Sequence, residues 1–475
     1  MISLGAFKRP LSIAHRGASA YARANTLQAF RFAHTLGADM WEVDLRVTAD
    51  DEIVAFHDDA LADGRAIADL TYEEIKKATV HGDIPRFSEV IALAKSLRAG
   101  IYADIKALEA AEPVCTALIK EDLSCVILGA FDLSIVNKLG EIGAPFPRAL
   151  LVPVGVDPFK VVGDAEIIHL CWERMDRPQD LLDEAFFKRC AAAGKQVVLW
   201  HEEDRQRMDV IRKLPVFGIC SDQPELVKPF VAPSDWPVEI VCHRGANAIA
   251  PENSLTAARA CFAAGFSHVE LDVHVTRDHQ LVVMHDDTLE RTSNGTGQVT
   301  EHSLEELRAL NVGEWFSDHY NDERIPTLSQ VLDLASDWGG KLYVELKSAP
   351  ADLVWECVCR HGMQDKCFFW SFNAQLLHDL RRISSDAKIM MRRQDFPSLE
   401  AVLANLAPSL VEYTCEDDLS ELPELMKLGV RSMIAYNGED EEVFRDIAAH
   451  RPDLVNLHRP FQFIQSVFKR GVGHE

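Results

Sequence analysis

The cysteines of this chain are scattered and form no recognisable pattern. Eleven of its 475 residues are cysteine, the one close pair is Cys357 and Cys359, and no C-x-x-C occurs. A disulfide framework or a zinc site needs regular spacings of cysteine and histidine, which the chain lacks. We therefore expect a reduced, intracellular protein.

Long hydrophobic runs are missing as well. No stretch reaches the roughly 18 uncharged apolar residues that a membrane-spanning helix needs. The segment before His15 has neither a continuous apolar run nor an A-x-A cleavage pattern. The sequence thus predicts a soluble, cytoplasmic protein without stable membrane association.

Positive charge is scarce. Lys and Arg number 49 against 74 Asp and Glu, which gives a net charge of −25. Nucleic acids and anionic membranes bind to basic surfaces, so we expect neither as a partner. A small anionic substrate needs only a few local basic residues and is compatible with this composition.

What the sequence does contain is an internal repeat. Residues 12–18 (SIAHRGA) recur as residues 240–246 (IVCHRGA), so that His15 matches His243 at an offset of 228. The same offset links Asn25 with Asn253, Glu42 with Glu270, Asp44 with Asp272, and His57 with His285. Further on, residues 104–106 (DIK) match residues 345–347 (ELK) at an offset of 241, so the second copy holds thirteen additional residues. Chance would not keep two offsets across so many polar positions.

Each copy has about 230 residues, a length typical of one α/β barrel. We expect one domain over residues 1–232 and a second over residues 233–475. Four prolines punctuate residues 224–237 (PELVKPFVAPSDWP), which have neither a helical nor a strand period. This stretch is predicted to be the linker.

Short apolar runs alternate with amphipathic segments in both copies. In the second copy the apolar runs are VEIVCH, HVELDVHV, LVVMHD, KLYVELK, CFFWSF, AKIMMR, LVEYTC, SMIAY and LVNLH. The segments between them, such as LSQVLDLASDW, have the apolar spacing of helices. This alternation predicts an α/β fold with two tandem TIM (β/α)8 barrels. Nine runs exceed eight strands by one, so we expect one of these assignments to be wrong.

The matched polar residues follow the ends of the predicted strands, where barrels of this kind build their active sites. Glu270 and Asp272 lie two residues apart on one strand and share a face, and Glu345 ends another strand. Three neighbouring carboxylates repel one another unless a cation neutralises them. An all-oxygen set favours one Mg²⁺ or Ca²⁺ ion per intact site.

Histidines and basic residues accompany these carboxylates. His243 and His285 are suited to act as general base and general acid, because imidazole titrates near neutral pH. Arg244 and Lys347 supply positive charge for a phosphate.

These motifs resemble the glycerophosphodiester phosphodiesterase family. In the second copy they read HRGA at 243–246, PENS at 251–254, ELD at 270–272, TRD at 276–278, HD at 285–286, LERT at 289–292, ELK at 345–347 and SF at 371–372. The resemblance implies a barrel with a small insertion at about residues 287–326 and the same metal, acid–base and phosphate roles. It also implies a mechanism in which a neighbouring hydroxyl of the substrate attacks phosphorus and water opens the resulting cyclic phosphate.

The first copy is similar but departs from the family pattern. Its third carboxylate is Asp104 where the second copy has Glu345, Ala24 replaces the acidic Glu252 that we expect at the mouth, and its insertion is shorter. The remaining candidate residues are kept: the acid–base residues His15 and His57, the metal ligands Glu42, Asp44 and Asp104, and the phosphate-binding Arg16 and Lys106. This copy is a second active site, a sugar or phosphate binder, or a packing scaffold.

The last two strands of the copies differ. The family commonly has a tryptophan in the seventh strand and T-D-x-P near the eighth, which the first copy approaches with Trp200 and residues 221–224 (SDQP). The second copy has other polar residues at these mouth positions, namely Tyr436, Asn437, His458 and Arg459. We expect them, with Glu252 and Trp200, to contact the substrate and to suit a polyol or sugar.

Three functions are compatible with these residues. The first is metal-dependent hydrolysis of a small glycerophosphodiester. The second is synthesis of a sugar phosphodiester, as in an agrocinopine synthase-like reaction that joins sucrose to an arabinose phosphate. The third is a sugar-phosphate binding protein, which the intact acid–base and metal residues of the second copy disfavour. The sequence leaves the oligomeric state open.

Overall fold

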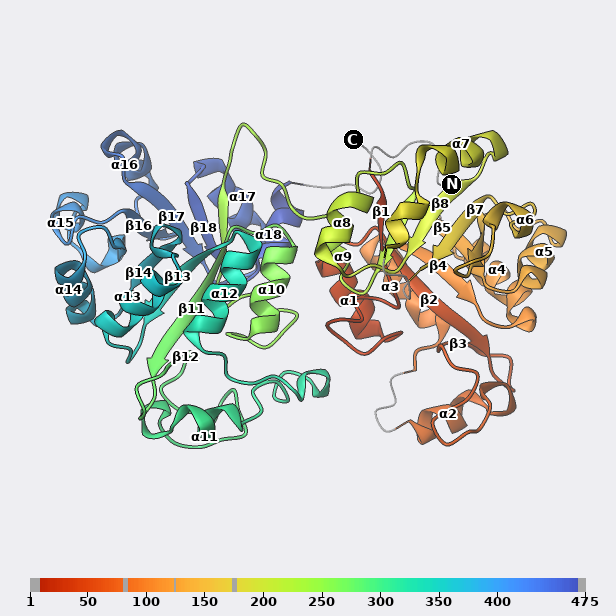
Figure 1. Cartoon of the computed structure of the whole chain (residues 1–475), viewed down its shortest axis with the longest axis horizontal. Helices are drawn as coiled ribbons and strands as arrows, with labels where there is room; N and C mark the ends of the chain where they lie inside the picture. Colours follow the sequence, from red (N-terminus) through yellow and green to blue (C-terminus); the bar gives the residue numbers. More distant parts are fainter. Residues whose placement is uncertain (1–8, 80–83, 124, 173–176, 469–475) are drawn as a thin grey trace. The chain divides into compact units, whose positions relative to one another are not determined.

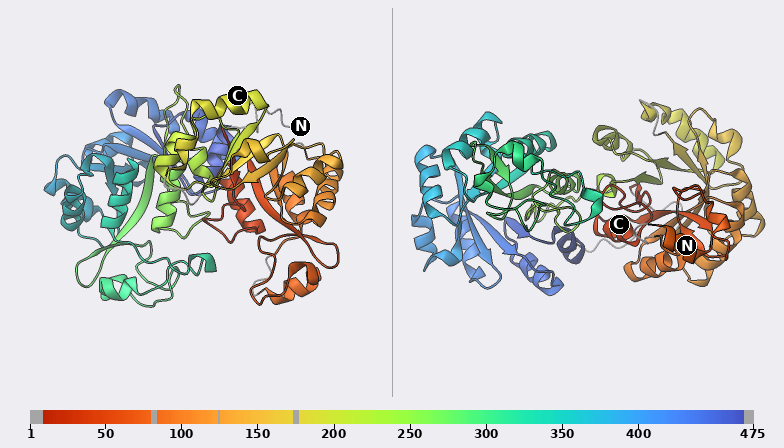
Figure 2. Two further views of the ribbon diagram at one scale, coloured as in Figure 1. Left: turned by 45° about the vertical axis from the view of Figure 1, so that its right-hand side comes forward. Right: turned by 90° about the horizontal axis from the view of Figure 1, so that it is seen from below.

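The chain folds into two compact units, which divide between Lys228 and Pro229. The computed structural model describes residues 9–79, 84–123, 125–172 and 177–468 (Figure 1). Each unit has its own closed β-barrel surrounded by helices (Figure 2). The predicted pair of (β/α)8 barrels is confirmed.

Eight parallel strands form the first barrel. They are β1 (Leu11–Ala14), β2 (Met40–Val47), β4 (Gly100–Ile105), β5 (Val126–Ala130), β6 (Arg148–Val152), β7 (Ile167–Cys171), β8 (Gln196–Trp200) and β9 (Gly218–Ser221). The barrel closes because β1 pairs with both β2 and β9. A short strand, β3 (Ile53–Ala55), pairs antiparallel with β2 outside the barrel.

The second barrel repeats this topology. Its strands are β10 (Glu239–Cys242), β11 (His268–Val275), β13 (Lys341–Leu346), β14 (Cys367–Trp370), β15 (Lys388–Arg392), β16 (Leu410–Thr414), β17 (Arg431–Tyr436) and β18 (Leu454–Leu457). All nine apolar runs are strands, but one of them does not belong to the eight-stranded barrel, as the surplus of one run indicated. The ninth, β12 (Leu281–Val283), pairs antiparallel with the end of β11 and lies outside the barrel.

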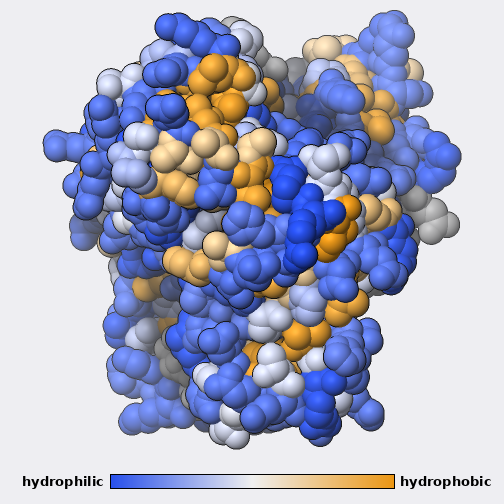
Figure 3. Space-filling view, turned by 90° about the vertical axis from the view of Figure 1, so that its left-hand side faces the viewer, coloured by the Kyte–Doolittle hydropathy of each residue, from blue (hydrophilic) through white to orange (hydrophobic). Residues whose placement is uncertain are grey.

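Helices cover the outside of both barrels. In the first unit they are α1 (Leu27–Thr35), α2 (Tyr72–Ala78), α3 (Phe87–Leu97), α4 (Ala111–Lys120), α5 (Leu133–Glu141), α6 (Pro158–Val161), α7 (Glu184–Ala193), α8 (Arg205–Ile211) and α9 (Pro224–Val227). In the second unit they are α10 (Leu255–Ala263), α11 (Leu304–Arg308), α12 (Leu328–Trp338), α13 (Ala351–Arg360), α14 (Ala374–Ile383), α15 (Leu399–Ala404), α16 (Leu422–Leu428), α17 (Glu441–His450) and α18 (Pro460–Val467). No helix in the described ranges is both long and apolar enough to cross a membrane. The face that carries α14 to α16 is mostly hydrophilic, with hydrophobic residues in separate patches (Figure 3).

Local signals in the sequence explain where these helices begin and end. Thr327 caps α12 with its hydroxyl, and the side chain of Gln330 bonds back to the Thr327 amide, which forms a capping box. Gly339 ends the same helix in the left-handed conformation that glycine adopts most easily. The buried residues of α12 recur every three or four positions and face the barrel.

An insertion follows the antiparallel strand in each unit. It contains α11 in the second unit and α2 in the first, and each helix lies at the end toward which β11 or β2 points (Figure 1). In the second unit 44 residues separate β12 from α12, whereas 31 separate β3 from α3, which accounts for the thirteen additional residues. A separate apolar cluster, which includes Leu289 and Leu307, holds the longer insertion together.

The predicted linker is partly wrong. Its first four residues form α9, because proline is well tolerated at the start of a helix. Glu225 in this helix is buried and accepts a hydrogen bond from the Tyr21 hydroxyl, so the segment belongs to the first unit. Further along, the Phe230 amide donates to the Ala264 carbonyl of the second unit. The irregular connection is therefore shorter than the proline pattern indicated.

Candidate active sites

Three carboxylates meet at the mouth of the second barrel. Glu270 and Asp272 share one face of β11, and Asp272 is the register partner of Glu345 on β13. One oxygen from each residue lies within 4.8 Å of the other two, and all three residues are buried. These residues form what we call the second acidic cluster, and the structure brings them together as the strand spacing predicted.

Two basic residues contact this cluster. The backbone amide of Arg244 donates to Glu270 Oε2 at 2.7 Å. The guanidinium Nε of the same residue lies 3.7 Å from Asp272 Oδ2. Lys347 Nζ lies 3.1 Å from Asp272 Oδ1 and also contacts Glu345. Arg244 has a φ of 58°, and the following Gly245 has a φ of 80° in a turn where a Cβ would clash with Ala257. This turn thus aims the Arg244 amide at the carboxylates.

The electrostatics of this cluster fit a divalent cation. Burial and the adjacent carboxylates raise the pKa of Glu270 well above its ordinary value. The same causes raise the pKa of Glu345 to about 7. Glu270 Oε1 has no hydrogen-bond partner among the described residues. A buried carboxylate oxygen without a partner is unfavourable, and an all-oxygen set of this kind suits Mg²⁺ or Ca²⁺.

His243 stands beside the cluster. Its Nε2 lies 3.9 Å from Glu270 Oε2, and its Nδ1 lies 3.1 Å from the Nδ1 of His458. The Asn247 amide donates to the same His458 nitrogen at 2.9 Å, which requires that nitrogen to act as an acceptor. Burial and nearby positive charge lower the pKa of His243 well below its ordinary value. These contacts favour a neutral ring whose Nε2 faces the cluster.

His285 is held by a chain of charged residues. Its Nδ1 lies 2.6 Å from Asp286 Oδ1, which leaves Nε2 for a substrate. Arg291 from the insertion donates to both Asp286 and Glu252, at 2.6 and 2.7 Å. Glu252 also accepts from Arg244 at 3.0 Å. This Arg291 clasp connects the insertion to both sides of the mouth.

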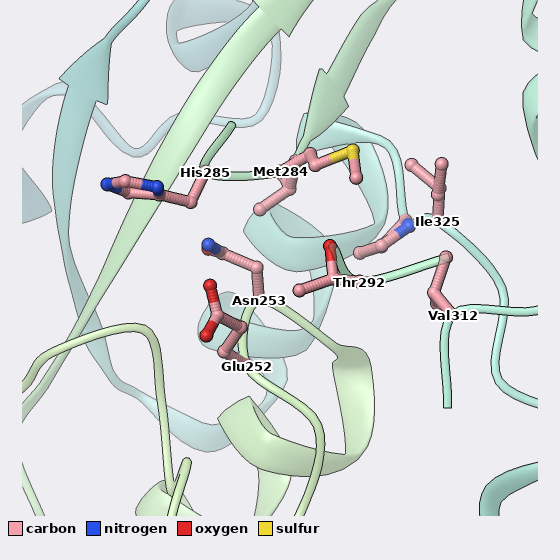
Figure 4. A pocket seen from close by; sticks show the side chains of 9 residues that line it. Glu252, Asn253, Met284, His285, Thr292, Val312 and Ile325 are labelled. Carbon is pink, nitrogen blue, oxygen red and sulfur yellow. The ribbon is translucent and has the colours of Figure 1, made fainter. Parts of the chain in front are cut away.

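A pocket lies between the mouth and the insertion. The polar ends of Glu252, Asn253 and His285 gather on one side of it, and Val312 and Ile325 lie on the other (Figure 4). The Asn253 amide donates to Asp272 Oδ2 at 2.8 Å and orients that carboxylate. The pocket therefore joins the acidic cluster to an apolar wall from the insertion.

The first barrel reproduces the cluster. Glu42, Asp44 and Asp104 are buried with one oxygen each within 4.8 Å of the others, and we call them the first acidic cluster. The Arg16 amide donates to Glu42 Oε2 at 2.8 Å, and Lys106 Nζ lies 2.7 Å from Asp44 and 2.5 Å from Asp104. Burial raises the pKa of Asp104 to about 6 and that of Glu42 well above its ordinary range. The shorter carboxylate is thus still part of the cluster.

The surroundings of the first cluster differ. His15 Nδ1 pairs with Asp222 Oδ1 at 2.7 Å, where the second barrel has the His243–His458 pair. Although burial acts in the opposite direction, the hydrogen bond with His15 holds the pKa of Asp222 at about 2. The His15 ring stacks on His201 at 4.9 Å and lies 5.3 Å from Trp200. His57 is bonded to Asp58, but both side chains are largely exposed.

The predicted substrate residues fall into two groups. Glu252, His458 and Trp200 lie against residues of the sites, as described above. Tyr436 instead packs on Phe444 of α17 and accepts from the Asp440 amide, while Asn437 is exposed on the following loop. Arg459 donates to Asn247 at 3.1 Å. The structure thus brings only part of this predicted set to the acidic clusters.

Several residues of the second site were given no role from the sequence. They are Asn247, Asn253, Asp286 and Arg291. Asn253 was detectable, because Asn25 repeats it in register and makes the equivalent bond to Asp44. The repeat does not mark Arg291, because Asp63 occupies its position in the first copy, although Arg291 lies in the LERT motif at 289–292. Only the fold shows that the insertion returns to the mouth.

A (β/α)8 barrel that gathers carboxylates, basic residues and two histidines at the carboxyl ends of its strands defines a class of barrel phosphodiesterases. The model of the Glycerophosphoryl diester phosphodiesterase family matches residues 15–130 and 243–423, and the chain belongs to this family. The resemblance found in the sequence is confirmed, and the family match extends to both barrels.

Individual relatives resemble about half of the chain. A glycerophosphodiester phosphodiesterase of Caldanaerobacter subterraneus subsp. tengcongensis is 31% identical over 229 residues, which cover 42% of this chain and 94% of the relative. A crystal structure of an Agrobacterium tumefaciens glycerophosphodiester phosphodiesterase is 34% identical and covers 48% of this chain and 98% of its own, with a TM-score of 0.45. An Oleispira antarctica phosphodiesterase, solved with the product sn-glycerol-3-phosphate, is 25% identical and covers 49% and 97%, with a TM-score of 0.45.

Proposed function

We propose that the second barrel hydrolyses a small glycerophosphodiester with the help of one divalent cation. The observation that carries this proposal is the meeting of Glu270, Asp272 and Glu345 with two histidines and two basic side chains at one mouth. Glu270, Asp272 and Glu345 would hold Mg²⁺ or Ca²⁺. When bound, the ion would stabilise the negative charge that develops on the phosphate.

The residues of the chain account for the other steps. Arg244 and Lys347 bind the phosphate oxygens. His243 and His285 form the acid–base pair: one accepts the proton of the substrate hydroxyl that attacks phosphorus, and the other protonates the departing alcohol. Water then opens the cyclic phosphate, which gives glycerol phosphate.

Polar and aromatic groups at this mouth favour a polyol or sugar as the alcohol. Phe372 is 72% exposed, and its ring centre lies 5.2 Å from the Arg392 guanidinium and 5.6 Å from Lys347 Nζ. An exposed ring flanked by cations provides a stacking surface with hydrogen-bond donors around it. The same surface makes transfer to a sugar hydroxyl, in an agrocinopine synthase-like reaction, the second candidate.

A matched pair of variants tests the location of the activity. Glu345→Gln removes one carboxylate charge from the second cluster, and Asp104→Asn does the same in the first. Release of choline from glycerophosphocholine should fall at least about 100-fold in Glu345→Gln and change by less than about twofold in Asp104→Asn. The opposite ranking would contradict the assignment to the second barrel.

A substrate panel tests the type of reaction. The full chain with Mg²⁺ or Ca²⁺ is offered glycerophosphocholine alone and, separately, arabinose phosphate with sucrose. Hydrolysis of the first and no product from the second is the expected result. A sugar phosphodiester without hydrolysis would replace the proposal with the synthetic reaction.

A further inference from the structure

A buried histidine contacts the backbone of His285, the second residue of the acid–base pair. His274 lies two residues after Asp272 on β11, so the two side chains share a face of the strand, and His274 is fully buried. Its Nε2 lies 3.4 Å from the carbonyl oxygen of His285. A carbonyl oxygen can only accept, so this nitrogen carries a hydrogen and donates it. The Met284 amide donates to the Asp272 carbonyl, so the His274 side chain continues the contact with β11 by one residue, to His285.

The other nitrogen of this ring contacts the loop that follows β13. The Ser348 hydroxyl lies 2.9 Å from His274 Nδ1, which in a neutral ring with a hydrogen on Nε2 is the acceptor. The Val275 amide donates to the same hydroxyl oxygen at 3.3 Å. Ser348 comes directly after Lys347, which contacts the second acidic cluster. One ring therefore connects the segment that carries His285 with the segment that carries Lys347.

The first barrel makes the same carbonyl contact with a different residue. Arg46 occupies the position of His274, and its Nε donates to the His57 carbonyl at 3.0 Å. Ala107 occupies the position of Ser348, so the hydroxyl that forms the second link belongs to the second barrel alone. Two side chains of unlike shape thus donate to the carbonyl of the equivalent histidine. Packing requires a matching shape at this position, whereas a fixed histidine backbone requires a donor, and the donor is what the two barrels share.

We propose that His274 is a positioning residue for the reaction at the second barrel. Its two hydrogen bonds hold the backbone of His285 at a fixed place relative to Lys347, and thereby hold the imidazole of His285 relative to the phosphate. This inference rests on the proposed function, in which His285 belongs to the acid–base pair. Proton transfer needs the imidazole within hydrogen-bond reach of the substrate oxygen. His274 acts through His285 and does not itself contact the substrate.

Two variants of the full chain separate this role from simple packing. His274→Leu fills the space but removes both hydrogen bonds, whereas His274→Gln keeps an amide that can donate to the carbonyl. In His274→Leu, kcat for choline release from glycerophosphocholine should fall about tenfold and KM should change by less than about twofold, because the groups that bind the substrate remain. His274→Gln should retain at least about a third of the original kcat. A leucine variant as active as the glutamine variant, or a change in KM alone, would overturn the proposal.

A buried histidine at the other end of the same strand provides the matched control. His268 begins β11, is 3% exposed and contacts the neighbouring Ser267 hydroxyl through Nδ1. His268→Leu should leave kcat within about twofold of its original value. An equal loss of kcat in this variant would show that damage to the strand causes the effect, and would overturn the proposal. His274→Met, which also lacks a donor, takes the place of His274→Leu if thermal unfolding shows that the leucine variant does not fold.

A double-mutant cycle shows whether His274 acts through His285. In the His285→Ala background, His274→Leu should lower the residual kcat by less than about twofold, because the side chain that it positions is gone. A tenfold loss in this background as well would overturn the proposal. The single variant His285→Ala reports separately on the proposed function: full choline release would contradict the acid–base pair, and this inference with it. A large loss in His285→Ala without any effect of His274→Leu in the unsubstituted background would contradict this inference alone.

Discussion

The two barrels share their acidic clusters and differ in many of the residues around them. Each has three buried carboxylates, an arginine amide that donates to the first of them and a lysine that bridges the other two. These groups lie on strands or directly after them, where the ladder of the barrel fixes their positions. The differences lie in the loops. Duplication has therefore kept the groups that we propose to bind metal and phosphate, while the side chains that contact the first histidine have changed.

The partner of the first histidine illustrates this difference. Asp222 accepts from His15, whereas His458 faces His243 in the second barrel. A neighbouring carboxylate stabilises the protonated form of an imidazole, whereas a neighbouring neutral imidazole favours the neutral form. Burial lowers the pKa of both histidines, but Asp222 counteracts this shift in His15, whereas nearby positive charge adds to it in His243.

The largest expected effect comes from replacing the equivalent histidines of the two barrels, His243 and His15. His243→Ala should lower the turnover of glycerophosphocholine about 10²- to 10⁴-fold, because it removes one member of the acid–base pair. His15→Ala should change it less than about twofold. Added imidazole should restore part of the activity of His243→Ala, which a merely unfolded variant would not show. Equal losses in the two variants would mean that both barrels contribute to this reaction.

A buried acid distinguishes the stability of the two units. Burial raises the pKa of Glu225 to about 7 from an ordinary value of 4.5, and the second copy has Phe461 at this position. The folded chain therefore keeps a proton that the unfolded chain releases. The contribution of Glu225 to the free energy of unfolding therefore decreases by about 2.5 kcal/mol from pH 5 to pH 8.

Glu225→Gln should remove this dependence, because the amide resembles the protonated acid in shape and charge. In thermal unfolding of the full chain, the midpoint temperature of the first unit's transition should fall between pH 5 and pH 8. We expect this fall to be about 5 to 10 °C larger in the unsubstituted protein than in Glu225→Gln. The transition of the second unit serves as the control. Parallel pH profiles for the two proteins would show that Glu225 is ionised in the folded state.

The repeat made the fold and the acidic clusters predictable from sequence. Two offsets aligned the strands, and the ends of parallel strands meet by geometry, so Glu270, Asp272 and Glu345 could be placed together. The same alternation of apolar runs could not separate barrel strands from β12. That strand is as apolar as the others, because it packs on the insertion, and only its antiparallel pairing reveals its place.

The contacts that loop side chains make could not be predicted from the sequence. The exchange of SDQP for LHRP was visible in the sequence, but the contact between His458 and His243 was not. Tyr436 was expected at the mouth, yet its ring packs on Phe444. A loop side chain has several directions open to it, and tertiary packing selects one. Periodicity carries no information about that selection.

The smallest expected effect tests the Arg291 clasp. Arg291 connects Asp286 to Glu252, whereas the first barrel has Asp63 and Ala24 at the equivalent positions. The His285–Asp286 pair is 31% and 25% exposed, compared with 44% and 70% for His57 and Asp58. The clasp therefore holds the second histidine in a more enclosed position.

Arg291→Ala should lower kcat for glycerophosphocholine about tenfold, because Asp286 loses the partner that orients it toward His285. Arg291→Lys should retain part of the activity, since one ammonium can contact only part of this carboxylate pair. Removing the guanidinium of Arg65, which pairs with Asp63 in the first barrel, is the matched control and should leave kcat unchanged. If Arg291→Ala raised KM alone, the clasp would serve binding of the substrate, and the difference between the two mouths would lie in affinity instead of catalysis.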